Sequence, residues 1–248
     1  MREELVFGPI HSRRLGASLG INLLPTRGKL CNFDCIYCEC GLNADGKGDR
    51  RLPTATELES ALEQYLRRCA AEGTAIDSIT FSGDGEPTLN PDFPRIVAIT
   101  LRLRDLYYPS AKVSVLTNAT RLDSPGVLAA LKRIDNPILK LDAVTDEMAG
   151  HINRPVGRYH VREIVDGMKS FDGDFVLQTM FLKGPGISAE EIVPGWMDIV
   201  RELRPREVMV YTLDRPAPVP GLSKYSSQEM ERMVQPLVNE GFNIKIYE

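Results

Sequence analysis

Three cysteines lie close together in the run Cys31-Asn-Phe-Asp-Cys-Ile-Tyr-Cys38, at Cys31, Cys35 and Cys38. Their spacing places three thiolates around one face of a short loop. Three protein ligands suit a 4Fe–4S cluster whose fourth iron stays open, whereas ferredoxin-type clusters take four cysteines and only pass electrons. An open iron can coordinate a small molecule. The loop therefore predicts a metal centre with chemistry beyond simple electron transfer.

Other interpretations of the cysteines are weaker. Cys40 offers a fourth nearby thiol, so a structural zinc site is conceivable, but zinc sites usually combine two separated pairs of ligands and no second pair is present. Five cysteines are an odd number, and a chain of 248 residues needs no disulfides for stability. We interpret Cys40 as a loop residue outside the ligand set. Cys69 follows Leu62 and Leu66 at helical spacing and reads as a small core residue.

With Tyr37 preceding the last cysteine, the loop resembles that of the radical S-adenosylmethionine (radical SAM) superfamily. The resemblance implies a 4Fe–4S cluster held by Cys31, Cys35 and Cys38, whose open iron chelates the amino and carboxylate groups of S-adenosylmethionine (SAM). It also implies that Tyr37 lies near the adenine of SAM.

A second segment fits the same family. The run Ser82-Gly-Asp-Gly-Glu-Pro-Thr-Leu89 contains glycines, which let a backbone approach a ligand closely, and a proline, which makes the turn rigid. It resembles the superfamily's Gly-Gly-Glu-Pro motif, with Asp84 where the first glycine usually stands. The resemblance implies that backbone carbonyls of this turn bind the methionine amino group of SAM, the residues being Gly83, Asp84, Gly85, Glu86 and Pro87.

Polar residues at the ends of predicted strands complete the candidate site. They are Thr117, Asn118, Lys140, Asp142 and Gln178, with Tyr211 on a further strand. The resemblance suggests contacts of Thr117 and Asn118 with the ribose or the methionine carboxylate of SAM, and the strand positions of the other residues make them candidates to contact SAM or substrate. Four of them also have a plain structural interpretation: Asn118 caps a turn, Lys140 and Asp142 neutralise each other, and Gln178 is a hydrogen-bonded core amide.

Short β-rich runs alternate with helical patterns along the chain, which indicates βα units and a parallel sheet. About six units are too few for a closed eight-stranded barrel. The resemblance implies an open, partial (β/α)6 barrel, which we predict for residues 1–248 as a single domain with a short N-terminal lead-in. The strands are expected at Ser18–Leu24, Ile76–Ser82, Lys112–Thr117, Ile138–Asp142, Phe175–Leu182, Glu207–Tyr211 and Asn243–Tyr247. The helices are expected at Glu57–Glu72, Asp92–Leu106, Ser124–Arg133, His160–Phe171, Ala189–Leu203 and Ser226–Glu240.

Two long connections stand out, because loops longer than about 12 residues are often functional. They are Glu39–Pro53 and the proline-rich Thr212–Tyr225, and both are expected near the mouth of the barrel. The lead-in Phe7–Pro25, Ile152–Pro155 and Tyr211–Pro218 resemble a group of stand-alone radical SAM proteins related to wyosine-tRNA biosynthesis enzymes.

Composition narrows the cellular setting. Clustered thiols and a first segment without the apolar core of a signal peptide favour the reducing cytoplasm. No apolar run reaches the roughly 18 residues that a membrane span needs. A net charge of −4 argues against a globally basic nucleic-acid binder. Local basic clusters remain, at Arg13–Arg14, at Lys47, Arg50 and Arg51, and at Arg154, Arg158 and His160; we interpret them as solvated surface groups.

The resemblance implies an enzyme that cleaves SAM into methionine and a 5′-deoxyadenosyl radical, which abstracts hydrogen from a substrate. The expected partners are a low-potential electron donor of the flavodoxin or ferredoxin type and a substrate that is RNA, a protein or another molecule. An activating enzyme of a glycyl radical enzyme is the alternative within the family. An Fe–S electron carrier or a zinc-binding module is the non-enzyme alternative.

Overall fold

The structure, a computed structural model, describes residues 4–45 and 50–248. The chain divides into two compact units. The first comprises Met1–Cys31, Asn43–Thr117 and Arg121–Pro137, and the second comprises Asn32–Leu42, Asn118–Thr120 and Ile138–Glu248. Each unit has parallel strands flanked by helices. The prediction of a single domain stays a prediction.

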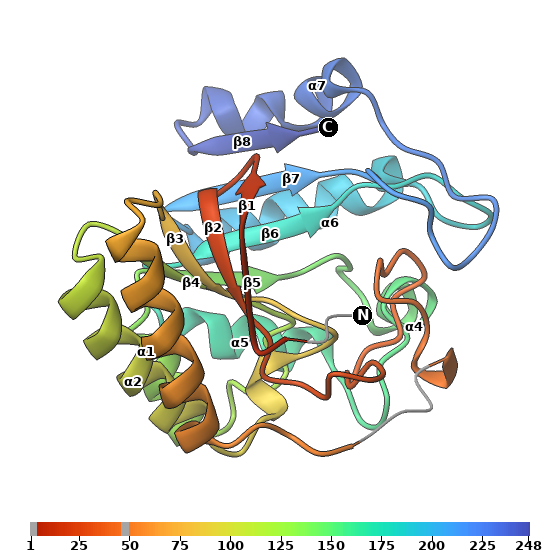
Figure 1. Ribbon diagram of the computed structural model, residues 1–248. Helices are drawn as coiled ribbons and strands as arrows, with labels where there is room; N and C mark the ends of the chain where they lie inside the picture. The colour runs from red at the N-terminus through yellow and green to blue at the C-terminus, as the bar shows by residue number, and fades with distance from the viewer. Residues whose placement is uncertain (1–3, 46–49) are drawn as a thin grey trace. The chain divides into compact units, whose positions relative to one another are not determined.

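The first unit contains strands β1 (Val6–Ser12), β2 (Gly16–Ile21), β3 (Ser78–Phe81) and β4 (Lys112–Thr117) in chain order. β1 pairs antiparallel with β2, while β2, β3 and β4 are parallel. The helices α1 and α2 lie side by side (Figure 1). The unit's helices are α1 (Ala55–Ala71), α2 (Phe93–Tyr107) and α3 (Pro125–Leu131), with short 3-10 turns η1 (Asn43–Asp45) and η2 (Pro87–Leu89).

Helix α1 shows how local sequence sets these elements. Thr54 and Glu57 form a reciprocal capping box at its start, which satisfies backbone N–H groups that have no partner within the helix. Leu58, Leu62 and Cys69 recur at helical spacing and are buried, as the sequence predicts for Cys69. The helix therefore covers the sheet with one apolar face.

The second unit contains β5 (Asn136–Lys140), which starts at the end of the first unit, and then β6 (Val176–Met180), β7 (Glu207–Tyr211) and β8 (Ile244–Tyr247). All are parallel, with Lys140 opposite Gln178 and Met180 opposite Tyr211. The helices of this unit are α4 (Asp146–Ile152), α5 (Val161–Lys169), α6 (Ala189–Leu203) and α7 (Ser227–Asn239).

Trp196 of α6 organises the core of the second unit. It is fully buried and meets Phe181 edge to face at 5.3 Å. Its indole N–H donates to Thr179 Oγ1 at 2.9 Å, and Thr179 donates to the carbonyl of Leu141 at 2.8 Å. This chain of contacts fixes the segment that follows β5, where the candidate site begins.

The predicted elements are present, with boundaries shifted by a few residues, and β1, α4 and the two 3-10 turns are additional. β1 lies within the segment that was expected from the sequence only as a short N-terminal lead-in. α4 is capped by Thr145, whose side chain accepts from the N–H of Met148, and the sequence prediction contains no helix at this place. β5 ends at Lys140, so Asp142 lies just beyond the strand rather than inside it.

None of the helices in the described ranges is both long and apolar enough to cross a bilayer. In the cluster at Arg154, Arg158 and His160, Arg158 pairs with Glu163 and His160 with Asp146, both on the surface. Lys47 of another predicted cluster lies outside the described residues, as does part of the Glu39–Pro53 connection.

Candidate active site

The cysteine loop is held by a neighbouring segment of the second unit. The N–H of Asp34 donates to the carbonyl of Asn153 at 2.8 Å, and that of Ile36 donates to the carbonyl of Ile152 at 3.0 Å. In return, the N–H of Val156 donates to the carbonyl of Asn32 at 2.8 Å. These bonds fix the backbone on both sides of Cys35, which makes the loop a defined structure rather than an open turn.

The side chain of Asn153 also contacts a cysteine of the loop. Its Nδ2 donates to Cys35 Sγ at 3.4 Å and to Asp142 Oδ2 at 2.7 Å. Burial raises the pKa of the Cys35 thiol, and the nearby charge of Lys140 offsets part of that rise. A single buried amide thus connects a predicted cluster ligand to the end of β5.

Tyr37, Lys140, Asp142 and Tyr211, all candidates from the sequence, meet in one buried network. Tyr37 donates its hydroxyl hydrogen to Asp142. Lys140 Nζ donates to Tyr37 OH at 3.0 Å and to Tyr211 OH at 2.5 Å, and lies 3.8 Å from Asp142 Oδ2. Asp142 Oδ1 accepts from the N–H of Met180 at 2.9 Å. The carboxylate therefore has three donors besides the ammonium.

Electrostatics favour a protonated Tyr37 and a charged Lys140 in this network. Burial and the Asp142 carboxylate raise the pKa of Tyr37 well above its usual value, so the phenol stays protonated. Burial alone would lower the pKa of Lys140, but Asp142 and Tyr211 outweigh it and raise that pKa, so the ammonium stays charged. The charge pairing of Lys140 with Asp142 is present, as the plain structural interpretation expected.

Gln178 stands directly opposite Lys140 in the β5–β6 register, and side chains of registered neighbours share a face of the sheet. It is 3% exposed, and its Nε2 has no hydrogen-bond partner among the described residues. Buried amides are normally hydrogen-bonded. The expectation of a fully satisfied core amide is therefore wrong, and a donor on the same face of the sheet as Lys140 is available to a ligand.

The glycine turn lies in the first unit and joins the backbone just before Cys31. The N–H of Leu30 donates to the carbonyl of Asp84 at 2.9 Å, and the N–H of Glu86 donates to the carbonyl of Leu30 at 3.0 Å. Between them Gly85 has φ +141°, and a Cβ there would lie 1.9 Å from the carbonyl oxygen of Leu30. Only glycine fits this approach.

Two side chains support the turn. Asn22 is fully buried, and its Oδ1 accepts from the N–H of Asp84 at 3.3 Å and from that of Leu24 at 3.2 Å. Its Nδ2 has no partner among the described residues. Glu86 accepts from Thr88 and, at 2.7 Å, from the hydroxyl of Thr117. Thr117 therefore braces Glu86 through its hydroxyl.

Asn118 belongs to the second unit, and its side chain makes two sets of structural hydrogen bonds. Its Oδ1 accepts from the N–H and the hydroxyl of Thr120, at 3.1 and 2.7 Å, so it caps a turn. Its Nδ2 donates to Asn32 Oδ1 at 2.7 Å, and Asn32 donates to Thr120 at 2.6 Å. The turn-capping interpretation is confirmed, and the turn that results holds the residue after Cys31.

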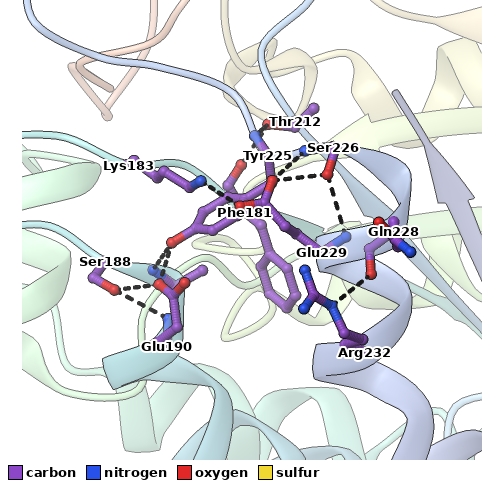
Figure 2. A network of polar contacts seen from close by, with 11 residues as sticks. Phe181, Lys183, Ser188, Glu190, Thr212, Tyr225, Ser226, Gln228, Glu229 and Arg232 are labelled. Atoms are coloured by element: carbon purple, nitrogen blue, oxygen red, sulfur yellow. Dashed lines mark hydrogen bonds and ion pairs between the residues drawn. The ribbon is translucent and has the colours of Figure 1, made fainter.

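The proline-rich connection also reaches the cysteine loop within the second unit. The N–H of Val219 donates to the carbonyl of Ile36 at 3.3 Å, and Arg215 pairs with Glu39 at 2.9 Å. Figure 2 shows what fastens its far end: the ring of Tyr225 lies beneath Lys183, and its hydroxyl points to Glu190 at the start of α6. Tyr225 is fully buried, so this end is firmly anchored.

The donor set fits an iron–sulfur cluster. Three thiols stand within eight residues on a backbone that hydrogen bonds hold on both sides of Cys35. Among the described residues, no three His, Cys, Asp or Glu side chains are gathered as a metal site. Cys31 belongs to the first unit, and Cys35 and Cys38 belong to the second. The ligand assignment thus rests on the type and spacing of the residues.

Comparison with known proteins supports the sequence resemblance. A family model described as the radical SAM superfamily matches residues 26–193. The chain is 30% identical over 217 residues to a UPF0026 protein of Helicobacter pylori, covering 86% of this chain and 67% of the relative. It is 31% identical over 217 residues to a UPF0026 protein of Methanocaldococcus jannaschii, covering 86% and 64%. The match thus spans about two thirds of these relatives.

Solved structures with similar folds include a radical SAM methyltransferase from Sphaerobacter thermophilus, with TM-score 0.68 and 17% identity over 93% of this chain and 65% of that one. For Streptococcus suis SuiB bound to SAM, the TM-score is 0.66 and the identity 16%, and the match covers 90% of this chain and 49% of that one. For TYW1 with a lysine-pyruvate adduct bound, the TM-score is 0.64 and the identity 12%, and the match covers 91% of this chain and 74% of that one. These likenesses confirm the predicted fold class, an open partial (β/α)6 barrel, to which β1 adds an antiparallel strand.

Proposed function

Because the chain belongs to the radical SAM superfamily and groups with the UPF0026 proteins, we propose that it binds a 4Fe–4S cluster through Cys31, Cys35 and Cys38 and cleaves SAM. The observation that carries the proposal is the Asn153 amide, which joins the Cys35 thiol to Asp142 within the matched residues. The Asn153 side chain hydrogen-bonds both a cysteine sulfur and the carboxylate just beyond a strand end. Such supporting hydrogen bonds are what a metal-binding loop needs to keep one geometry.

When bound, such a cluster supplies one electron to the sulfonium of SAM, which then yields methionine and a 5′-deoxyadenosyl radical that abstracts hydrogen from substrate. The residues of the protein would bind and orient SAM and the substrate and exclude water from them. We assign the methionine amino group of SAM to the turn Gly83–Pro87 and the adenine to the vicinity of Tyr37. Thr117 supports the glycine turn through its hydrogen bond to Glu86, and Asn118 supports the cysteine loop through its hydrogen bond to Asn32.

We assign Lys140, Gln178 and Tyr211 to the substrate. The Nε2 of Gln178 has no hydrogen-bond partner among the described residues, and Lys140 stands opposite Gln178 in the strand register. A radical reacts only with a C–H bond held at near contact, so residues that position substrate affect hydrogen transfer more than SAM cleavage. Asp142 is a poor test of this role, because its loss would also release Asn153 and Tyr37.

Tyr211→Phe tests the assignment. It removes a hydrogen bond to the charged Lys140, which costs about 1.5–3 kcal/mol, and we expect deuterium transfer from substrate to fall about ten- to hundredfold. Uncoupled formation of 5′-deoxyadenosine should change little. Tyr108→Phe is the matched control, because its phenol donates to a backbone carbonyl, that of Thr74. Equal loss of both activities, with a lower melting temperature, would favour a purely structural network.

The function itself is tested by anaerobic reconstitution with iron and sulfide, followed by dithionite and SAM. One 4Fe–4S cluster per chain and release of 5′-deoxyadenosine and methionine are expected. An Fe–S carrier or a zinc module would not cleave SAM. Incubation with deuterated cell extract, divided into RNA, protein and small-molecule fractions, then identifies the substrate class. Label from the RNA fraction supports an RNA base as substrate, and label from protein supports the glycyl radical activase alternative.

A further inference from the structure

The segment that holds the cysteine loop also presents side chains to solvent. Asn153 is buried, while Arg154, Val156, Gly157 and Arg158 are exposed. Val156 is 66% exposed, the highest value among the exposed large hydrophobic residues of the described chain. The backbone of the same segment bonds to Asn32, Asp34 and Ile36, as described above. A short stretch therefore has one side on the predicted cluster loop and the other in water.

Arg154 has an unusual conformation. Its φ is +47°, in the left-handed region that side chains other than glycine avoid at a cost of about 1–3 kcal/mol. Its N–H donates to the carbonyl of Ala149 at 2.9 Å, and its carbonyl accepts from Asp34 at 3.2 Å. These bonds hold the strained residue in place, and such residues concentrate at functional sites.

The guanidinium of Arg154 makes no hydrogen bond or ion pair within residues 4–45 and 50–248. Its neighbour Arg158 differs, because it pairs with Glu163 at 2.6 Å. Arg154 thus presents an unneutralised positive charge two residues from an exposed valine. An apolar centre beside a charged rim is the usual composition of a protein-binding surface.

We propose that Arg154 and Val156 form the docking surface for a small acidic protein that donates single electrons to a cluster at the cysteine loop. This inference rests on the proposed function. The path inward is short, because Asn153 follows the surface directly and its amide touches Cys35 Sγ at 3.4 Å. The donor loses one electron and the group bound by the cysteines gains it; no bond forms or breaks.

The physical form of the surface suits such a partner. Interfaces of redox partners are small, less than about 1,200 Å² in total, so two residues can carry much of the recognition. An acidic partner is attracted by the free arginine, and the attraction weakens as salt screens it. A nucleic acid would also be attracted by the cation, but the exposed Val156 side chain can neither donate nor accept a hydrogen bond with a phosphate or a base.

Binding is measured directly with oxidised flavodoxin as the probe, titrated into the full chain with and without reconstituted iron and followed by flavin fluorescence anisotropy. We expect Arg154→Glu and Val156→Asp each to weaken binding about tenfold or more, and Arg154→Lys to retain most of it. Arg232→Glu and Val238→Asp are matched controls on exposed positions of α7, and they should bind normally. Thermal melting shows whether each variant folds.

A second readout compares two ways of reducing the reconstituted enzyme. Flavodoxin with its reductase and NADPH should drive 5′-deoxyadenosine formation at least about tenfold more slowly in Arg154→Glu than in the wild type. Dithionite, which needs no docking, should drive both equally. Equal flavodoxin binding by wild type and variants would overturn the inference, as would binding of single-stranded RNA, but not flavodoxin, lost in Arg154→Glu. Failure of dithionite to cleave SAM in the wild type would instead overturn the proposed function.

Discussion

Cys35→Ala is expected to abolish both cluster incorporation and SAM cleavage, and Cys31→Ala and Cys38→Ala should do the same. Each substitution leaves a three-ligand cluster with two thiolates, and cluster binding depends on the thiolate ligands. Cys35→Ala also deprives the Asn153 amide of its sulfur partner. Iron and sulfide per chain, the absorption of the reconstituted protein and 5′-deoxyadenosine release are the measurements.

Cys40→Ala is the matched control for these variants. Cys40 closely follows the predicted ligands, within the turn that is closed by the N–H of Gly41 donating to the carbonyl of Cys38 at 3.0 Å. The variant should keep a full cluster and most of its activity. Loss of iron from Cys40→Ala, with cluster retained after loss of one of the other three thiols, would show that the ligand set is wrongly assigned.

Gly85→Val is expected to have the second largest effect. The added Cβ meets the carbonyl oxygen of Leu30 at 1.9 Å, and that oxygen belongs to backbone, which cannot rotate away. The φ of +141° adds strain for any side chain. Overpacking of this kind lowers the free energy of unfolding by about 1–3 kcal/mol, and displacement of the turn should lower SAM affinity at least about tenfold.

Gly73→Ala separates strain from collision. Gly73 also has a positive φ, of +68°, but a Cβ there has no atom within 4 Å. This control should lose some stability and no SAM affinity. SAM affinity by equilibrium dialysis, iron content and melting temperature are measured for both variants. We expect the Gly85 variant to retain its iron. Unchanged SAM affinity in that variant would remove the glycine turn from the binding site.

The cysteine loop, the glycine turn and the alternation of strands and helices could be predicted because each is encoded locally. Spacing indicates which thiols could share a metal, and periodicity indicates which segments form strands or helices. The meeting of Tyr37, Lys140, Asp142 and Tyr211 was only partly predictable. Alternation put Lys140 and Asp142 on one face, but nothing local shows that Tyr37 reaches them across 105 residues of sequence.

Three asparagines show why the remainder was missed. Asn22, Asn32 and Asn153 carry the supporting hydrogen bonds of the site, yet asparagine is also a common turn residue and no pattern distinguishes the two uses. Asn153 stood within the Ile152–Pro155 segment that the family resemblance singled out, which was the available signal. Its partner Cys35 lies 118 residues away, and only the folded chain brings them together.

Asn153 couples the cysteine loop to the end of β5. One amide group holds a sulfur of the cysteine loop and a carboxylate whose other oxygen is bonded to β6. A change in how firmly either partner is held must alter the other, and thermodynamic linkage makes that influence mutual. Metal binding at the sulfur and binding of a small molecule at the strand ends would then be coupled. Whichever ligand binds first would change the affinity of the protein for the second.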